Sequence, residues 1–119
     1  MTENIRFGPS IESIVAPLVL DFTFADHPGP VLIGNVGAGR MIRETVLLIE
    51  DAFDGNIEIT IGDMLAQGRL QTVYDNYPDH VDRYNVSNCV DYAVDTDVYL
   101  FFPVGIPTVG SGRVIVFLD

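Results

Sequence analysis

Short apolar runs, interrupted by Gly, Pro or Asp about every ten residues, are the feature of this sequence that most restricts its fold. The runs are rich in Val and Ile and often alternate with polar residues at a period of two, which is typical of strands that bury one face. No long segment has the period of an amphipathic helix. We therefore predict an all-β protein of roughly seven to nine short strands with at most one short helical turn, arranged as an antiparallel two-sheet sandwich or jelly roll.

The length of 119 residues suits one domain and is too small for two. Residues 1–119 are therefore interpreted as a single β-sandwich domain, in which residues 1–12 form a candidate N-terminal docking arm. Strands are predicted at residues 13–24, 31–36, 40–50, 56–61, 97–103 and 113–118, with shorter ones at 73–74, 83–86 and 89–94.

Three local patterns make sharper predictions. The continuous apolar run at residues 46–49 indicates a central strand that is buried on both faces. Asp54-Gly55 is a strong hairpin signal, so the strands on either side of it are expected to pair. The helix-forming residues within 62–70, with Asp63 as a cap, predict a single helical turn.

The charge balance narrows the choice of partners. The chain has 17 acidic residues and 6 basic ones, a formal net charge of −11 and a pI near 4.2. Nucleic acids and anionic membrane surfaces repel such a chain, so neither is expected as a partner. All six cations are Arg, which excludes Schiff-base chemistry by Lys and suits bidentate pairing with carboxylates. Arg40, Arg43 and Arg113 are therefore candidate interface residues.

A single cysteine and the N-terminal sequence bear on the compartment. Cys89 has no partner for an intramolecular disulfide, which fits assembly in a reducing compartment, and it is predicted to be a small buried hydrophobe. The N-terminus lacks a basic stretch followed by an apolar run. No apolar run approaches the roughly 20 residues that cross a bilayer. The chain is expected to be soluble and unprocessed.

The residues that commonly carry catalysis give no recognisable pattern. His27 lies in a proline-rich turn and His80 in an acidic loop, and no Gly-x-Ser-x-Gly sequence is present. The glycines of residues 34–39 precede a strand pattern rather than the helix that a dinucleotide site requires. The aspartates between residues 75 and 97 lack the spacing of a calcium-binding loop. We predict no catalytic residues, no metal site and no cofactor.

Two groups of residues are candidate contact surfaces. The apolar stretch 101–107 contains Phe101, Phe102, Val104 and Ile106, and it is either a core strand followed by a turn or a contact between subunits. Three tyrosines in the acidic second half could stack on a sugar or other ligand. Alternatively, they stand at strand ends with their hydroxyls in water. These candidate ligand-contacting residues are Tyr74, Tyr77 and Tyr84.

Three segments together resemble a known group of proteins. They read AFDGNIEITIGD at residues 52–63, YAVDTDVYL at 92–100 and GSGRVIVFL at 110–118. In this order they resemble small β-sandwich virion structural proteins of tailed bacteriophages. There, an AFDG…T(I/V)GD hairpin precedes a variable loop, an A-x-D-T-D-V-Y strand and a final G-x-G-R-V-x-V strand.

The resemblance implies a non-enzymatic structural role. Proteins of this kind decorate or stabilise the capsid, or belong to head or tail fibres. We therefore expect a virion protein that assembles in the host cytoplasm. Its expected partners are copies of itself, in a trimer or another symmetric homo-oligomer, and the major capsid protein or another virion protein. The alternatives are a carbohydrate- or receptor-binding module of a tail or head fibre, which rests on the tyrosines, and a small enzyme.

Overall fold

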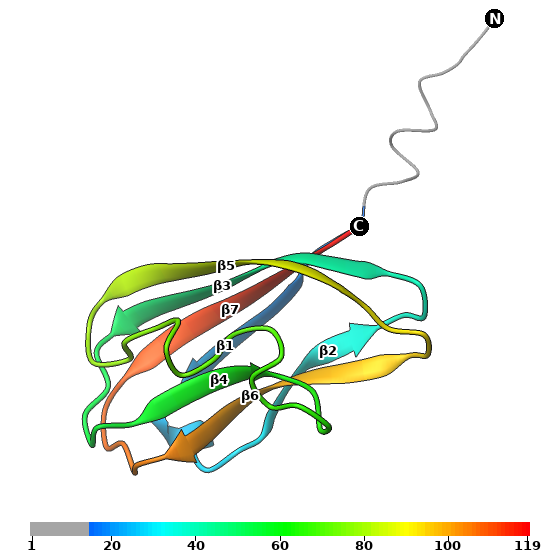
Figure 1. The fold of residues 1–119 in the computed structure, drawn as a ribbon. Coiled ribbons are helices and arrows are strands. Elements are labelled where there is room, and N and C mark those ends of the chain that lie inside the picture. The colour runs from blue at the N-terminus through cyan, green and yellow to red at the C-terminus, as the bar shows by residue number, and fades with distance from the viewer. Residues whose placement is uncertain (1–14) are drawn as a thin grey trace, which may run out of the picture.

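Seven strands within residues 15–119, the part of the chain that the computed structural model describes, form two antiparallel sheets packed face to face (Figure 1). One sheet has the strand order β1-β7-β3-β5 and the other has the order β2-β6-β4. The predicted all-β sandwich is thus confirmed. The proposed docking arm lies outside the described residues. The strands are β1 (Leu18–Thr23), β2 (Val31–Val36), β3 (Met41–Asp51), β4 (Glu58–Gly62), β5 (Asp82–Asp91), β6 (Thr96–Val104) and β7 (Ser111–Leu118).

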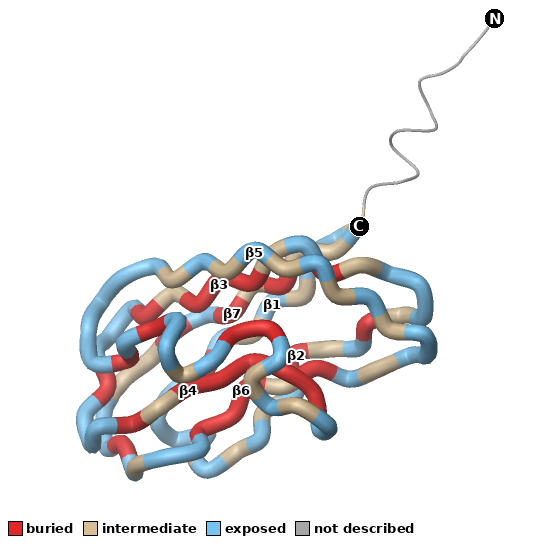
Figure 2. The backbone as a smooth tube through the Cα atoms, viewed as in Figure 1, coloured by how far each residue is buried: buried red, intermediate tan, exposed pale blue. Residues whose placement is uncertain are grey.

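The space between the two sheets is filled by one apolar core, to which every strand contributes (Figure 2). Three phenylalanines join the sheets at one end of this core. The ring of Phe22 on β1 lies 5.8 Å from that of Phe53 and 6.1 Å from that of Phe102 on β6. Contact between aromatic rings at these distances adds to the free energy gained by burying them.

The strand β3 is central, as its apolar run predicts. It lies between β7 and β5, and Val46, Leu47 and Ile49 are almost completely buried. Burial on both faces explains why this strand lacks a simple alternation of apolar and polar residues.

The predicted hairpin at Asp54-Gly55 is wrong, because β3 and β4 belong to different sheets. The carboxylate of Asp54 accepts hydrogen bonds from the backbone N–H groups of Thr108 and Val109, at 2.6 and 3.2 Å, and from the Thr108 hydroxyl. Gly55 has a φ of +79° and packs directly against the backbone of Ile106. Asp54 and Gly55 therefore form a corner that carries the chain across the core to the other sheet.

The predicted helical turn at residues 62–70 is also wrong in its position. Asp63 does accept two backbone hydrogen bonds as a cap, but the chain returns at once to pair with β4. The N–H of Leu70 donates to the carbonyl of Ile61 at 2.9 Å, and within the loop so closed Asp63 and Ala66 exchange two backbone hydrogen bonds instead of forming a helical turn. The helical turn of the described chain is instead the 3₁₀ turn η1 (Phe24–Asp26), which a capping box stabilises.

The strand β5 replaces two separate predicted strands, at residues 83–86 and 89–94. Asn88 interrupts the apolar alternation in the middle of this strand. Its side-chain amide donates to the carbonyl of Leu70 at 3.1 Å, so a polar residue occupies an inward position with a hydrogen-bond partner. Residues 73–74 are not a strand, since they belong to the loop between β4 and β5.

Cys89 is exposed, so its prediction as a buried hydrophobe is wrong. It lies on β5, which is an edge strand of the four-stranded sheet. Its thiol approaches the sulfur of Met41 at 3.8 Å. The edge position leaves this side chain open to solvent although its residue type is commonly buried.

Candidate binding groove and interaction surfaces

A groove of about 490 Å³ lies between the loop that follows β4 and the turn that joins β5 to β6. The pairing of residues 70 and 71 with β4 holds this loop close to the sheet, so its tip projects beside the end of β5. The groove walls include Asp63, Leu65, Arg69, Tyr92, Val94 and Tyr99.

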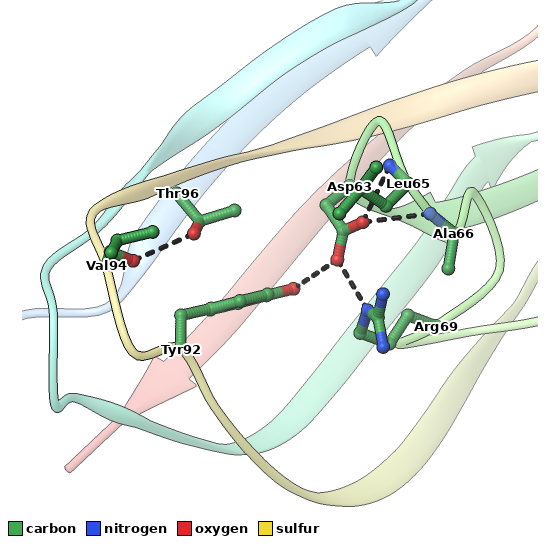
Figure 3. A network of polar contacts seen from close by, with 7 residues as sticks. All are labelled: Asp63, Leu65, Ala66, Arg69, Tyr92, Val94 and Thr96. Atoms are coloured by element: carbon green, nitrogen blue, oxygen red, sulfur yellow. Dashed lines mark hydrogen bonds and ion pairs between the residues drawn. The ribbon is translucent and has the colours of Figure 1, made fainter.

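The carboxylate of Asp63 organises the groove (Figure 3). One oxygen, Oδ1, accepts the backbone N–H groups of Leu65 and Ala66, both at 2.9 Å. The other oxygen, Oδ2, accepts Nε–H of Arg69 at 2.6 Å and the hydroxyl of Tyr92 at 2.8 Å. Asp63, which is only 3% exposed, thus holds the residues of the loop together and also joins the loop to Tyr92 at the end of β5.

The surroundings of Asp63 and Tyr92 determine the protonation states of both side chains. Burial acts to raise the pKa of Asp63, but the hydrogen bonds from Arg69, Tyr92 and the two backbone amides together hold it below its ordinary value. Burial and the hydrogen bond to Asp63 raise the pKa of Tyr92 well above that of a free tyrosine. Asp63 is therefore a carboxylate with its acceptor sites occupied, which suits it to structural support rather than to proton transfer.

Exposed apolar side chains rim the groove. Leu65 is 94% exposed at the tip of the loop, and Met64 and Val94 are also mostly exposed. The sequence interpretation placed Met64 and Leu65 in a helical turn and therefore missed this surface. Two adjacent apolar residues between Asp63 and Gly68, in a segment rich in turn formers, are the signal that could have found it.

The three candidate tyrosines are only partly brought together. The ring of Tyr77 lies 6.2 Å from that of Tyr84 and 6.3 Å from that of His80. The Tyr84 hydroxyl donates to the carbonyls of Tyr77 and His80, so Tyr84 supports the cluster. Tyr77 also lines a cavity of about 280 Å³ together with the buried Asn76. Tyr74 is 88% exposed, and no ring contact joins it to the other two within the described residues.

The apolar interface candidates divide by exposure. Phe101 and Phe102 are 5% and 6% exposed, and Phe102 belongs to the core. Val104 and Ile106 are 50% and 73% exposed, beyond the buried part of β6. Of the four, these last two therefore present the surface that a partner can reach.

Of the arginine candidates, Arg43 and Arg113 lie on the four-stranded sheet and Arg40 lies directly before β3. Arg113 donates from Nε to Asp21 at 2.6 Å, and from Nη2 at 3.3 Å. Arg43 pairs with Asp119 at 3.2 Å, and Arg40 donates to the carbonyl of the same residue at 3.5 Å. The structure therefore distributes the candidate interface residues over two sheets instead of gathering them in one patch.

Among residues 15–119, no three His, Cys, Asp or Glu side chains are grouped in a way that could hold a metal ion. The described part of the chain also contains no helix that is long and apolar enough to span a membrane.

Comparison with known proteins gives a match in solved structures. A chain described as "Cyanophage Pam1 capsid asymmetric unit" superposes with a TM-score of 0.61 and 16% sequence identity, over 87% of this chain and 81% of that chain. The likeness is one of fold. It extends over nearly all of the sandwich, so it concerns the arrangement of both sheets. No family model matches the sequence, and no curated protein matches it either.

Proposed function

We propose that this protein is a non-enzymatic structural component of a phage virion, which decorates or stabilises the capsid. The observation that carries the proposal is the match in fold of 87% of this chain to a chain described as part of a cyanophage capsid asymmetric unit. The ordered segments at residues 52–63, 92–100 and 110–118 support it independently, because they resemble phage virion proteins in sequence. Its partners are copies of itself and the major capsid protein or another virion protein.

The distribution of apolar and charged side chains supports a contact role. Val104 and Ile106 offer apolar area to the shell, while Phe101 and Phe102 hold the strand beneath them. Arg40, Arg43 and Arg113 offer guanidinium groups to carboxylates of a partner. The net charge of −11 keeps free molecules apart until such contacts form. Residues 1–12 are proposed as an additional docking arm.

Co-sedimentation with capsid shells that lack this protein tests the proposal. The wild-type chain should pellet with the shells, and Ile106→Asp should weaken this binding by about tenfold or more because it places a charge in an apolar contact. Val94→Asp is the matched control, since Val94 is similarly exposed but lies on the groove, and it should bind as the wild type does. A wild-type chain that stays in the supernatant at every concentration overturns the proposal.

A second function is favoured by the aromatic cluster around Tyr77. An exposed ring beside a cavity, with the carboxylates of Glu58 and Asp79 on its walls, is an arrangement that can stack on a sugar and accept hydrogen bonds from its hydroxyl groups. The buried Oδ1 of Asn76, on the same cavity, has no hydrogen-bond partner among the described residues. These features suit a carbohydrate- or receptor-binding module of a fibre.

A glycan array distinguishes this second function from the first. Binding that Tyr77→Ala abolishes and Tyr74→Ala leaves intact supports the carbohydrate-binding module, because only Tyr77 lines the cavity. If the protein binds no glycan on the array, the carbohydrate-binding function is excluded.

A further inference from the structure

The outer face of the four-stranded sheet carries two rows of side chains that cross all four strands. In the strand register, the residues of the first row lie side by side in the order Val19, Ile115, Val46 and Asn85. The second row consists of Asp21, Arg113, Leu48 and Arg83. Leu47 and Val114, which lie between the two rows, belong to the core. Because side chains alternate along a strand, both rows face away from the core.

The centre of this face is apolar. Val46 stands at its centre, outside the core between the sheets, but its neighbours within the monomer cover it completely, so the apolar area open to a partner comes from the side chains around it. Leu48 and Ile115, its neighbours on the face, are half-buried, and Val19 is 51% exposed on the edge strand β1. An apolar surface of this kind, rimmed by charged residues, is typical of a contact surface between proteins.

The charges on this face differ from those of the rest of the chain. Four of the five described arginines lie on this sheet or directly before β3. On the face itself, arginines on three strands, namely Arg43, Arg83 and Arg113, stand among the carboxylates of Asp21, Glu44, Glu50 and Asp91, so the charges there nearly cancel. In a chain of net charge −11, this is therefore a surface where two copies can approach without strong repulsion.

We infer that this face packs against the same face of a second copy, about a two-fold axis that runs parallel to the strands between β3 and β7. Such an axis places β1 of one copy over β5 of the other and β7 over β3, so each row meets the same row of the partner. Ile115 then lies against the side chains that cover the partner's Val46, and Arg83 faces the partner's Asp21. Each of these contacts occurs twice. The inference deepens the proposed function and rests on the self-association that forms part of it.

The groups that meet in this arrangement are complementary. The guanidinium group of Arg83 donates to Asn85 at 3.0 Å and forms no salt bridge within 4.0 Å among the described residues. Asp21 accepts two hydrogen bonds from Arg113, yet its side chain remains 66% exposed. A carboxylate has about four acceptor sites, so Asp21 can accept a second guanidinium group.

The size of the face approaches that of a small stable interface. Its four strands contain 35 residues, which at about 3.3 Å per residue and about 4.8 Å between strands cover roughly 550 Å². Stable interfaces bury about 800 Å² on each partner. Two sheets that pack face to face keep their strands nearly aligned and lie about 10 Å apart, as the proposed axis requires.

The test is the mass of the full chain in solution, measured by sedimentation equilibrium over a range of concentrations and without capsid shells. The wild type should form a dimer. Arg83→Asp and Asp21→Arg should each weaken it by about tenfold or more, because each sets like charges against one another at two places. An equimolar mixture of the two variants should restore the dimer, since every Arg then faces an acid. Asp97→Arg, which changes the net charge as Asp21→Arg does but lies on β6 in the other sheet, should dimerise as the wild type does.

Several results overturn the inference. These are a chain that stays monomeric, an oligomer that neither charge variant weakens, or a mixture that fails to restore the dimer. Val19→Asp provides a second probe that leaves the ion pairs intact, and dimerisation at wild-type strength in this variant also contradicts the proposed face. Shell co-sedimentation is measured separately. A monomer that binds shells overturns this inference alone, whereas a dimer that ignores shells overturns the role in the capsid alone.

Discussion

A single carboxylate, that of Asp63, accepts four hydrogen bonds and thereby sets the shape of the groove. Substitution by asparagine removes the negative charge to which Arg69 and Tyr92 donate their hydrogen bonds. We expect Asp63→Asn to lower the free energy of unfolding by about 1–3 kcal/mol, because hydrogen bonds to charged groups are the stronger ones. Urea denaturation measures the change. Asp79→Asn, at an exposed site, should stay within about 0.5 kcal/mol of the wild type, and equal effects of the two variants would falsify this role of Asp63.

Three aspartates with lowered pKa values determine how the stability of the fold responds to acid. Hydrogen bonds from Arg113 and Thr108 lower the pKa of Asp21 and Asp54 respectively, and those at Asp63 outweigh its burial to the same effect. A carboxyl whose pKa is lower in the folded state stabilises the fold above its unfolded pKa. This stability is lost as the pH falls through the folded value. Stability should therefore decline below about pH 4, and denaturation midpoints between pH 2 and 6 should show a shallower decline in Asp63→Asn.

At the scale of elements, the corner between β3 and β4 depends on contact rather than on turn preference. Gly55 and Gly39 have nearly the same φ, +79° and +81°. A Cβ on Gly55 would lie 2.3 Å from the carbonyl oxygen of Ile106, whereas one on Gly39 would meet nothing within 4 Å. Gly39→Ala should therefore cost about 1 kcal/mol for the backbone alone. Gly55→Ala should cost about 3 kcal/mol, because the corner must also move away from Ile106. Equal losses in thermal denaturation would show that the contact is unimportant.

At the scale of the whole molecule, stability and binding belong to different parts of the segment 101–107. Phe102→Ala should lower the free energy of unfolding by about 3–5 kcal/mol, because its ring fills the core beside Phe22 and Phe53. Ile106→Ala should change it by less than about 0.5 kcal/mol and should act on shell binding alone. Chemical denaturation and co-sedimentation of the same two variants measure both effects. A reversed pattern would contradict this division.

The sequence by itself determined most of the elements. Alternation at a period of two indicated β1 and β4, residues 31–36 were predicted with the bounds of β2, and the continuous apolar run of β3 indicated its central place. These features are local, because a strand that buries one face must alternate and one that buries both cannot. The sequence also indicated the class of the fold, which the number and spacing of such segments decide.

Only the tertiary structure decided how the elements are combined. Asp54-Gly55 has the local preference of a hairpin, yet contacts with residues 105–109 direct β4 to the other sheet. Asp63 has the preference of a helix cap, yet the pairing of residues 70 and 71 with β4 makes it the centre of a groove. The two rows on the outer sheet face likewise arise from register between strands that lie far apart in sequence. Local preferences amount to about 1 kcal/mol, and burial together with long-range hydrogen bonds outweighs them.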